Sequence, residues 1–208
     1  MRSDVLIVAR PGRSPHTEST GAIAVRRTGP ETVHLVSAAA TPLGGDALRL
    51  RVVVEDGARL QVRTVAATVV LPGAATTESH ACWMVEVAGT LDLDPEPTIV
   101  AGRARHTVHT ALSLTADASV RVRERVQIGR SGERAGYWSG ALRADVDGAA
   151  LLRHRIEVGA GSVADDAIAA PRAYEAELHY PASHVDSAGV TLALAGGGCL
   201  TTWQGDRL

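Results

Sequence analysis

Hydrophobic and polar residues alternate along much of this 208-residue chain, which is the pattern of β-strands with one buried face. The clearest run covers residues 48–55, where four aliphatic side chains share one face: Leu48, Leu50, Val52 and Val54. Polar side chains take the other face: Arg49, Arg51 and Glu55. Asp56-Gly57 follows, a pair that tolerates the positive φ angles of a two-residue turn. The run therefore predicts a β-hairpin whose return strand alternates over residues 59–64.

Similar segments recur from end to end, and most are separated by Gly, Pro or Asp. They cover residues 5–9, 22–27, 33–38, 48–55, 60–65, 83–87, 104–114, 120–128, 137–146, 151–158, 174–180 and 190–194. Asp147-Gly148 repeats the turn chemistry of Asp56-Gly57, and residues 72–79 have the small polar composition of an exposed loop. Short strands with regular turn signals predict an all-β fold, with residues 1–208 as a single domain.

Helix signals are few. Residues 162–171 are predicted to form a short helix that Ser162 caps and Pro171 ends, and residues 181–189 a further turn or two. The prediction is thus a mainly β protein with one or two short helices.

Composition narrows the classes of partner. All 21 basic residues are arginine, the net charge is −2, and the two signs are interleaved, which argues against a nucleic-acid partner. No stretch approaches the roughly 20 apolar residues of a membrane span, and the apolar run at residues 5–9 is shorter than that of a secretory signal. We expect no membrane association and a cytosolic protein.

Residues suited to catalysis are not arranged for it. The serines lack a Gly-x-Ser-x-Gly elbow, and Gly196-Gly197-Gly198 has no following helix that would cradle a phosphate. Cys82 and Cys199 have no Cys-x-x-Cys partner and are predicted to be core thiols of a reducing compartment. The sequence therefore predicts a protein that is not an enzyme.

Two pairs of possible metal ligands stand out. His106 and His109 lie three apart, so on a strand they face opposite sides and cannot share one ion without a bulge. His80 and Cys82 lie two apart and share a face, but two ligands alone bind weakly. We predict no closed metal site and no tightly bound cofactor.

Glu124 is the most unusual charged residue. By a period of two it shares a face with Val120, Val122 and Val126, while Arg121, Arg123 and Arg125 take the other. A charge on an apolar face is costly unless it is paired or hydrated. Glu124 is therefore either an exposed or salt-bridged residue or part of the polar lining of an internal channel.

Two further polar residues belong to the same question. His154 shares a face with Leu152 and Ile156. Asp46 ends the Gly44-Gly45 turn, where capping the loop is its simplest role.

Three blocks of residues resemble one family in order and spacing. The first block contains Leu43, Gly44, Gly45 and Asp46, then Gly57, Ala58 and Arg59, then Thr64, Ala66, Ala67 and Thr68. The second runs from Glu124 to Gly129 and Arg130, followed by Gly132 and Glu133. The third covers residues 148–155. Together they resemble the urease accessory protein family usually called UreD or UreH.

The chain also departs from the family pattern. Val69 and Val70 replace a basic-aromatic pair, residues 92–96 match a Glu-Trp-Leu-Pro-Gln motif only in part, and His154 stands where the family usually has Glu. Fuller members continue beyond the position of Leu208 with helical residues. We therefore expect a divergent, short member of the family.

The resemblance implies an assembly factor with strands stacked in β-helix-like layers. Such a factor would bind apo-urease, a helical UreF-type partner and, through the complex, a UreG-type GTPase that carries nickel. Asp46, Glu124 and His154 would offer transient ligands along a nickel route, because oxygen and imidazole groups suit Ni²⁺. The alternative is a metal-independent, β-sandwich-type module that recognises a protein or a saccharide.

Overall fold

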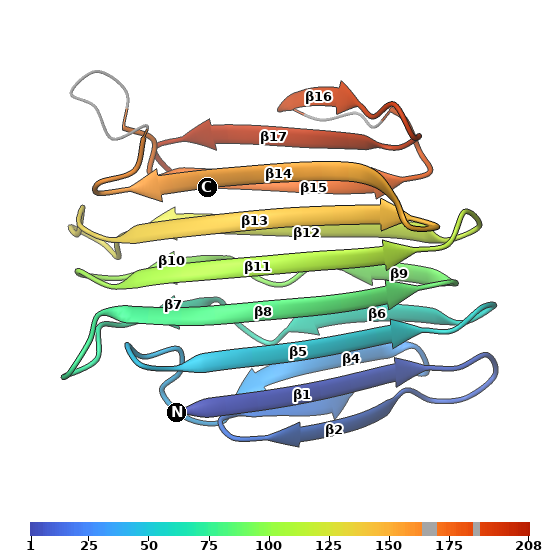
Figure 1. Cartoon of the computed structure of the whole chain (residues 1–208). Helices are drawn as coiled ribbons and strands as arrows, with labels where there is room; N and C mark the ends of the chain where they lie inside the picture. The colour runs from blue at the N-terminus through green and yellow to red at the C-terminus, as the bar shows by residue number, and fades with distance from the viewer. Residues whose placement is uncertain (164–169, 185–187) are drawn as a thin grey trace.

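The computed structural model describes residues 1–163, 170–184 and 188–208, and these residues form β-strands and no helix (Figure 1). The strands are β1 (Arg2–Ala9), β2 (His16–Thr20), β3 (Ile23–Arg27), β4 (Thr32–Ser37), β5 (Ala47–Val54), β6 (Arg59–Thr64), β7 (Thr68–Val70), β8 (Glu78–Val87), β9 (Thr90–Leu93), β10 (Thr98–Val100), β11 (Arg105–Leu114), β12 (Ser119–Ile128), β13 (Tyr137–Val146), β14 (Ala149–Gly159), β15 (Ala173–Tyr180), β16 (Val190–Ala193) and β17 (Cys199–Gly205). The all-β prediction is confirmed. The two short helices were predicted over segments whose middles, residues 164–169 and 185–187, lie outside the described residues.

The strands form two sheets stacked face to face (Figure 1). The seven-stranded sheet has the order β14-β13-β11-β8-β5-β1-β2. The ten-stranded sheet runs β16-β17-β15-β12-β9-β6-β4-β3, with β10 beside β12 and β7 beside β10. One apolar cluster fills the space between the sheets, and its largest fully buried members include Trp138, Tyr174, Ile7 and Leu60.

The chain passes repeatedly from one sheet to the other. Strand β5 belongs to the seven-stranded sheet, β6 to the ten-stranded sheet, β8 to the first again and β9 to the second. Neighbours within a sheet are therefore often parallel, as in β5, β8, β11 and β13. Successive strands that alternate between two sheets have the geometry of a β-helix, and this arrangement confirms the prediction of stacked mixed sheets.

The two Asp-Gly turns behave differently. Asp147-Gly148 joins β13 and β14 in an antiparallel hairpin, with Val146 opposite Ala149, as predicted. The hairpin predicted at Asp56-Gly57 is wrong, because β5 pairs with β1 and β8 while β6 pairs with β4 and β9. The turn reverses the chain, but both edges of β5 are already taken. The aliphatic faces of β5 and β6 meet across the two layers instead.

Several strands were not predicted. Strands β2, β7, β9 and β10 have three to five residues each, too few for a clear alternation. Strand β8 begins at Glu78, inside the segment predicted as a loop, and β17 follows the Gly196-Gly197-Gly198 turn directly. Pairing with neighbouring strands holds these segments extended.

The outward face of the ten-stranded sheet is a lattice of opposite charges. Arg121 of β12 binds Glu177 of β15 on one side, at 2.9 Å, and Asp92 and Asp94 on the other, at 3.2 and 3.1 Å. The remaining members of the lattice are Arg63, Arg123, Arg125 and Glu175. The arginines that alternate with apolar residues in the sequence therefore pair with acids on neighbouring strands, and this face has no field of a single sign.

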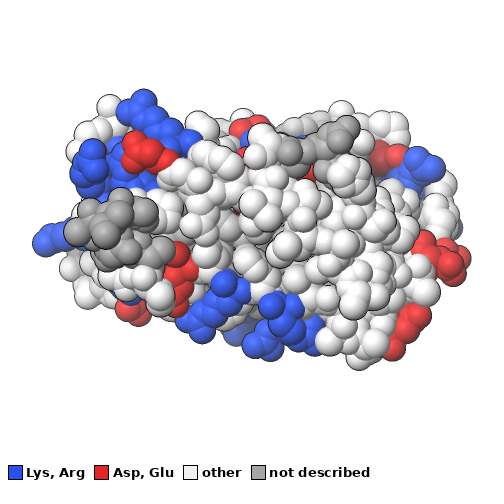
Figure 2. Space-filling model, turned by 90° about the horizontal axis from the view of Figure 1, so that it is seen from above, with Lys and Arg blue, Asp and Glu red and all other residues white. Residues whose placement is uncertain are grey.

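The edge of the molecule near β14, β16 and β17 is different. Figure 2, which views the molecule from above, shows a central area with few charged side chains and charged groups gathered around it. Val190 and Leu192 of β16 are 65% and 55% exposed. This edge is therefore poor in charge and carries two exposed aliphatic side chains of β16.

Candidate functional site

A cavity of about 230 Å³ lies between the two sheets. Strands β5, β8 and β11 supply one wall through Leu48, Leu50, Trp83 and Thr110, and β12 supplies much of the other. The cavity reaches the surface beside three exposed residues of the β6–β7 connection: Val65, Ala66 and Ala67. It is therefore an internal space with an opening through the ten-stranded sheet.

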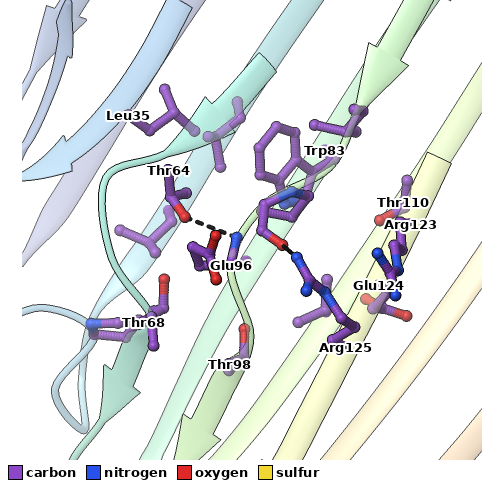
Figure 3. Close-up of a pocket in the computed structure, with 18 of the residues that line it drawn as sticks. Leu35, Thr64, Thr68, Trp83, Glu96, Thr98, Thr110, Arg123, Glu124 and Arg125 are labelled. Atoms are coloured by element: carbon purple, nitrogen blue, oxygen red, sulfur yellow. Dashed lines mark hydrogen bonds between the residues drawn. The ribbon is translucent and has the colours of Figure 1, made fainter. Parts of the chain in front are cut away.

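The opening exists because the sheet is interrupted there. β6 ends at Thr64 and β7 begins at Thr68, while β9 ends at Leu93 and β10 begins at Thr98. The two gaps lie side by side, and the segments between these strands form the rim (Figure 3).

Hydrogen bonds hold the rim in shape. The backbone N–H of Glu96 donates to Thr64 Oγ1 at 2.9 Å, and Arg125 Nη2 donates to the Pro95 carbonyl at 2.7 Å. Glu96 itself is exposed at the mouth.

Glu124 faces the cavity from the middle of β12 (Figure 3). β9 pairs with β12 as far as Val122 and β10 begins to pair only at Val126, so Glu124 lies beside the gap. No described residue donates a hydrogen bond to its carboxyl group, and burial alone raises its pKa to about 8. The group is walled in by protein while its oxygens still touch the cavity space. Glu124 thus lines the cavity and has no ion pair with a described residue, while its place in an internal channel stays a prediction.

Tyr174 of β15 lies opposite Val126, the next residue on the same face of β12 as Glu124, and contacts His154 of β14. Burial, and then the charge of Glu124, raise the pKa of the Tyr174 hydroxyl. That hydroxyl is hydrogen-bonded to His154 Nε2 at 2.8 Å, and the two rings are stacked with centroids 6.3 Å apart. Burial also lowers the pKa of His154 below its usual value, so the imidazole is neutral near pH 7. Of the three residues predicted from the sequence, Glu124 therefore faces the cavity and His154 lies against Tyr174, outside the cavity lining.

His106 is a cavity residue that sequence reasoning missed. It is 3% exposed, lines the cavity from β11, and its Nδ1 is hydrogen-bonded to Ser79 Oγ at 2.9 Å. Burial lowers its pKa to about 4, with a smaller contribution from His80, so it stays neutral at physiological pH. The signal was present in the alternation of His106 with Val108 and Thr110. His109 is exposed on the opposite side of β11 from His106, and this opposition is as predicted.

Asp46 lies in a different environment, in the loop before β5. Its carboxylate accepts hydrogen bonds from the Met1 amino group at 2.5 Å, from Thr41 Oγ1 at 2.8 Å and from the Leu43 backbone N–H at 2.8 Å. Burial acts to raise the pKa of Asp46, but these donors outweigh it and the pKa is lowered. Asp46 does not face Glu124; it holds the loop in which Thr41 and Pro42 line the cavity.

The glycines of the first family block are required by this loop. A Cβ at Gly44 would lie 1.8 Å from the Thr76 carbonyl oxygen, so only glycine fits there. Gly45 has a φ of 94°, in the region that favours glycine.

The second family block forms the tight turn after β12. A Cβ at Gly129 would lie 2.1 Å from the Glu133 carbonyl oxygen, whereas Gly132, with a φ of 79°, faces open space. The Glu133 carboxylate accepts hydrogen bonds from the guanidinium and backbone N–H of Arg130 and from the Gly102 N–H, and these lower its pKa to about 2. The block Gly129, Arg130, Gly132 and Glu133 is therefore a structural turn that also contacts the residues around Gly102.

The remaining metal candidates do not form a centre. His80 and Cys82 share the outer face of β8, and parallel pairing with β11 places His109 beside Cys82. Within the described residues, no three His, Cys, Asp or Glu side chains are arranged to hold a metal ion. Cys82 is half-buried, Cys199 is buried, and both are free thiols.

Sequence comparisons with known proteins identify the family of the chain. The sequence model described as "UreD urease accessory protein" matches residues 11–197. A urease accessory protein UreD of Frankia alni is 48% identical over 158 residues, covering 72% of this chain and 53% of that protein. Urease accessory protein UreD 1 of Saccharopolyspora erythraea is 40% identical over 183 residues, covering 84% of this chain and 72% of that protein.

A UreD of Frankia casuarinae is 42% identical over 154 residues, covering 71% of this chain and 48% of that protein. The chain therefore spans about half the length of the two Frankia proteins. None of the described segments forms a helix of the length and apolarity that crossing a membrane requires. With a match over most of its length, the chain belongs to the UreD family of urease accessory proteins.

Proposed function

We propose that this protein is a urease maturation factor, a scaffold that binds apo-urease and the other accessory proteins and assists the delivery of nickel. The partners would be a helical UreF-type protein and, through the complex, a UreG-type GTPase that carries nickel. The support is the family match over residues 11–197 and the names of the relatives. The proposal includes a cytosolic location and no chemical reaction catalysed by the protein itself.

The observation that carries the nickel part of this proposal is the unpaired carboxyl group of Glu124. Carboxylate oxygens are suitable ligands for a divalent cation, and no described residue competes for those of Glu124. Binding of Ni²⁺ must displace the proton that the raised pKa keeps on the group near neutral pH. A single ligand with this cost holds nickel weakly, which suits a route and not a store.

His154 extends the proposed route toward the edge of the sheets. Its imidazole is neutral near pH 7, as metal coordination requires, and it is hydrogen-bonded to Tyr174, which is close to Glu124. We propose Glu124 and His154 as successive transient ligands. Asp46 supports the route by holding the loop that lines the cavity. That Asp46 also coordinates nickel directly stays a prediction from the sequence.

The test is maturation of urease at limiting nickel with purified variants. We expect Glu124→Ala and His154→Ala each to fold and to bind apo-urease but to lower the nickel content and activity of the urease produced. Glu86→Ala is the matched control, because Glu86 is an acid on the outer face of β8 that pairs with Arg51 at 2.9 Å away from the cavity. Fully nickel-loaded urease with both Glu124→Ala and His154→Ala would show that these residues are ordinary structural polar groups.

A separate measurement tests the scaffold role. Co-purification of the wild-type chain with urease subunits supports it, and the Glu124→Ala variant should co-purify equally well. If the wild-type chain does not co-purify with urease subunits, the result would favour the alternative predicted from the sequence, a metal-independent module that binds another protein or a saccharide.

A further inference from the structure

A second hollow, of about 340 Å³, lies on the outward face of the seven-stranded sheet, away from the cavity. The residues that shape it come from β11, β13 and β14: Arg105, Thr107, His109, Tyr137, Ser139 and Arg155. We propose that this hollow binds an oxyanion, supplied either as a free anion or as the carboxylate of a partner protein's side chain.

The hollow follows from strand register. On β11, Arg105 lies opposite Tyr137 of β13 and Thr107 lies opposite Ser139. One step further along the sheet, Ala141 of β13 lies opposite Arg155 of β14. Short side chains therefore form a floor at the centre, and long cationic side chains rise at two of its borders. Such a floor with guanidinium groups at its borders is the shape that accommodates a small anion.

The floor carries polar groups that have unused hydrogen-bonding capacity. Ser139 is only 6% exposed, and its hydroxyl makes no hydrogen bond with any described residue. The same holds, within the described part of the chain, for Thr107 Oγ1 and the imidazole of His109. Buried polar groups are normally paired, so the buried Ser139 hydroxyl is a donor that a bound oxyanion would satisfy, with the half-buried Thr107 and the exposed His109 beside it.

The charge at the hollow is also suitable. The Arg105 guanidinium lies over the Tyr137 ring at 3.8 Å from the centroid, and the closest approach of Glu78 to it is 4.0 Å. Stacking uses the face of a guanidinium and leaves its N–H edge for a ligand, and such an edge binds carboxylate or phosphate oxygens in a fork. Arg155 donates to Glu157 through Nη2 and is otherwise highly exposed. Each of these two cations has one carboxylate near it, Glu78 at 4.0 Å from Arg105 and Glu157 at 2.9 Å from Arg155, and Glu157 lies opposite Ser139. The N–H groups that these contacts leave free are the ones available to an oxyanion.

Binding can be measured by isothermal titration calorimetry of the full chain at low salt, with two probes. Sodium phosphate represents a free anion, and the capped peptide acetyl-Gly-Glu-Gly-amide represents a side-chain carboxylate. We expect saturable binding of at least one probe. Ser139→Ala and Arg105→Gln should each weaken it about fivefold or more, and Glu78→Gln should strengthen it by removing a like charge.

Arg153→Ala is the matched control, since Arg153 lies on the same face of β14 as Arg155 but pairs with Asp145 at 2.5 Å outside the hollow. Its affinity should equal that of the wild type. Arg155→Gln replaces Arg105→Gln if circular dichroism shows that the latter is unfolded. Binding of phosphate alone identifies a free anion as the ligand, and binding of the peptide alone identifies a protein carboxylate. No saturable binding of either probe, or binding that Ser139→Ala and the arginine variant leave unchanged, overturns the proposal.

Discussion

Asp46 and Glu124 are two carboxyl groups enclosed by the same fold, and the fold treats them in opposite ways. Asp46 accepts three hydrogen bonds in a tight loop, and its pKa is lowered. Glu124 accepts none from the described residues and faces a cavity, and its pKa is raised to about 8. The first acid stabilises the structure around it. Glu124 has no partner among the described residues that would stabilise its charge, so an apolar residue would serve the fold equally well. A functional role is therefore the reason we propose for this acid.

The two regions also differ in packing. Around Asp46 the backbone segments touch, because Gly44 lies against residues 73 and 76 of another loop. Around Glu124 the neighbouring strands are interrupted, and space remains. The region that holds its shape is therefore close-packed, and the region proposed to pass a ligand is open.

The largest effect should come from Gly44→Ala. A Cβ there would overlap the Thr76 carbonyl oxygen, and backbone cannot move aside cheaply. We expect a loss of more than about 3 kcal/mol in the free energy of unfolding, measured by urea denaturation. Gly132→Ala is the control: its φ is positive but its Cβ would meet open space, so the loss should be about 1 kcal/mol. Equal losses for both variants would contradict the close packing of the loop.

Replacing each of the two acids should show the difference between the two regions as a difference in unfolding free energy. Asp46→Ala leaves the Thr41 hydroxyl and the Leu43 N–H without their acceptor, and we expect a loss of about 2–4 kcal/mol. Asp46→Asn keeps an acceptor oxygen and should lose about half as much. Glu124→Ala removes a buried group that has no partner, so the unfolding free energy at pH 7 should fall by less than about 1 kcal/mol, or rise because the cost of keeping the group protonated disappears. A loss for Glu124→Ala as large as that for Asp46→Ala would mean that Glu124 is structural.

Local patterns predicted much of what surrounds these acids. The face of Glu124 on its strand and the burial of Leu48, Leu50, Val52 and Val54 follow from a period of two, which depends only on neighbouring residues. The Gly44-Gly45 turn likewise carries its own signal. These features are local, so the sequence is sufficient to find them.

The cavity was not predictable in the same way. It arises where β6 gives way to β7 and β9 to β10, and those strands meet only through pairing between distant segments. The Asp56-Gly57 turn shows the same limit, because its residues specify a reversal but not the sheet in which the next strand pairs. His106 and Ser139 acquire their roles from residues on neighbouring strands, which the sequence does not order.

The pH dependence of stability should have opposite signs for the two acids. The folded pKa of Glu124, about 8, lies above its ordinary value of 4.5, so the folded state holds a proton that the unfolded state releases. Its contribution is fully present below pH 4.5 and is lost as pH rises through 8, by roughly 3 kcal/mol after allowance for hydration of the cavity. Asp46 has a lowered folded pKa, so its contribution is present above pH 3.8 and is lost as pH falls through the folded value.

Urea denaturation of the wild type and of Glu124→Gln at pH 5 and pH 9 measures how much unfolding free energy Glu124 loses as the pH rises. The glutamine amide does not titrate, so the variant should lose less stability than the wild type between these two pH values. Asp46→Asn should retain the wild-type alkaline loss and reduce only the loss below pH 4. If Glu124→Gln and the wild type lose stability in parallel up to pH 9, the carboxyl group is already ionised and hydrated in the folded protein.

A small effect should also come from Tyr174→Phe. The substitution removes the hydroxyl that is hydrogen-bonded to His154 Nε2 but keeps the ring that packs on Trp138, with centroids 5.6 Å apart. We expect a loss of about 1 kcal/mol in the free energy of unfolding, because one hydrogen bond disappears while the packed volume is nearly kept. The raised pKa of Glu124 comes from burial alone, so the pH at which the wild type loses alkaline stability should not move in this variant. A shift of that midpoint by a full pH unit would show that the Tyr174 hydroxyl bonds to the Glu124 carboxyl group, and the acid would then be partly structural, as Asp46 is.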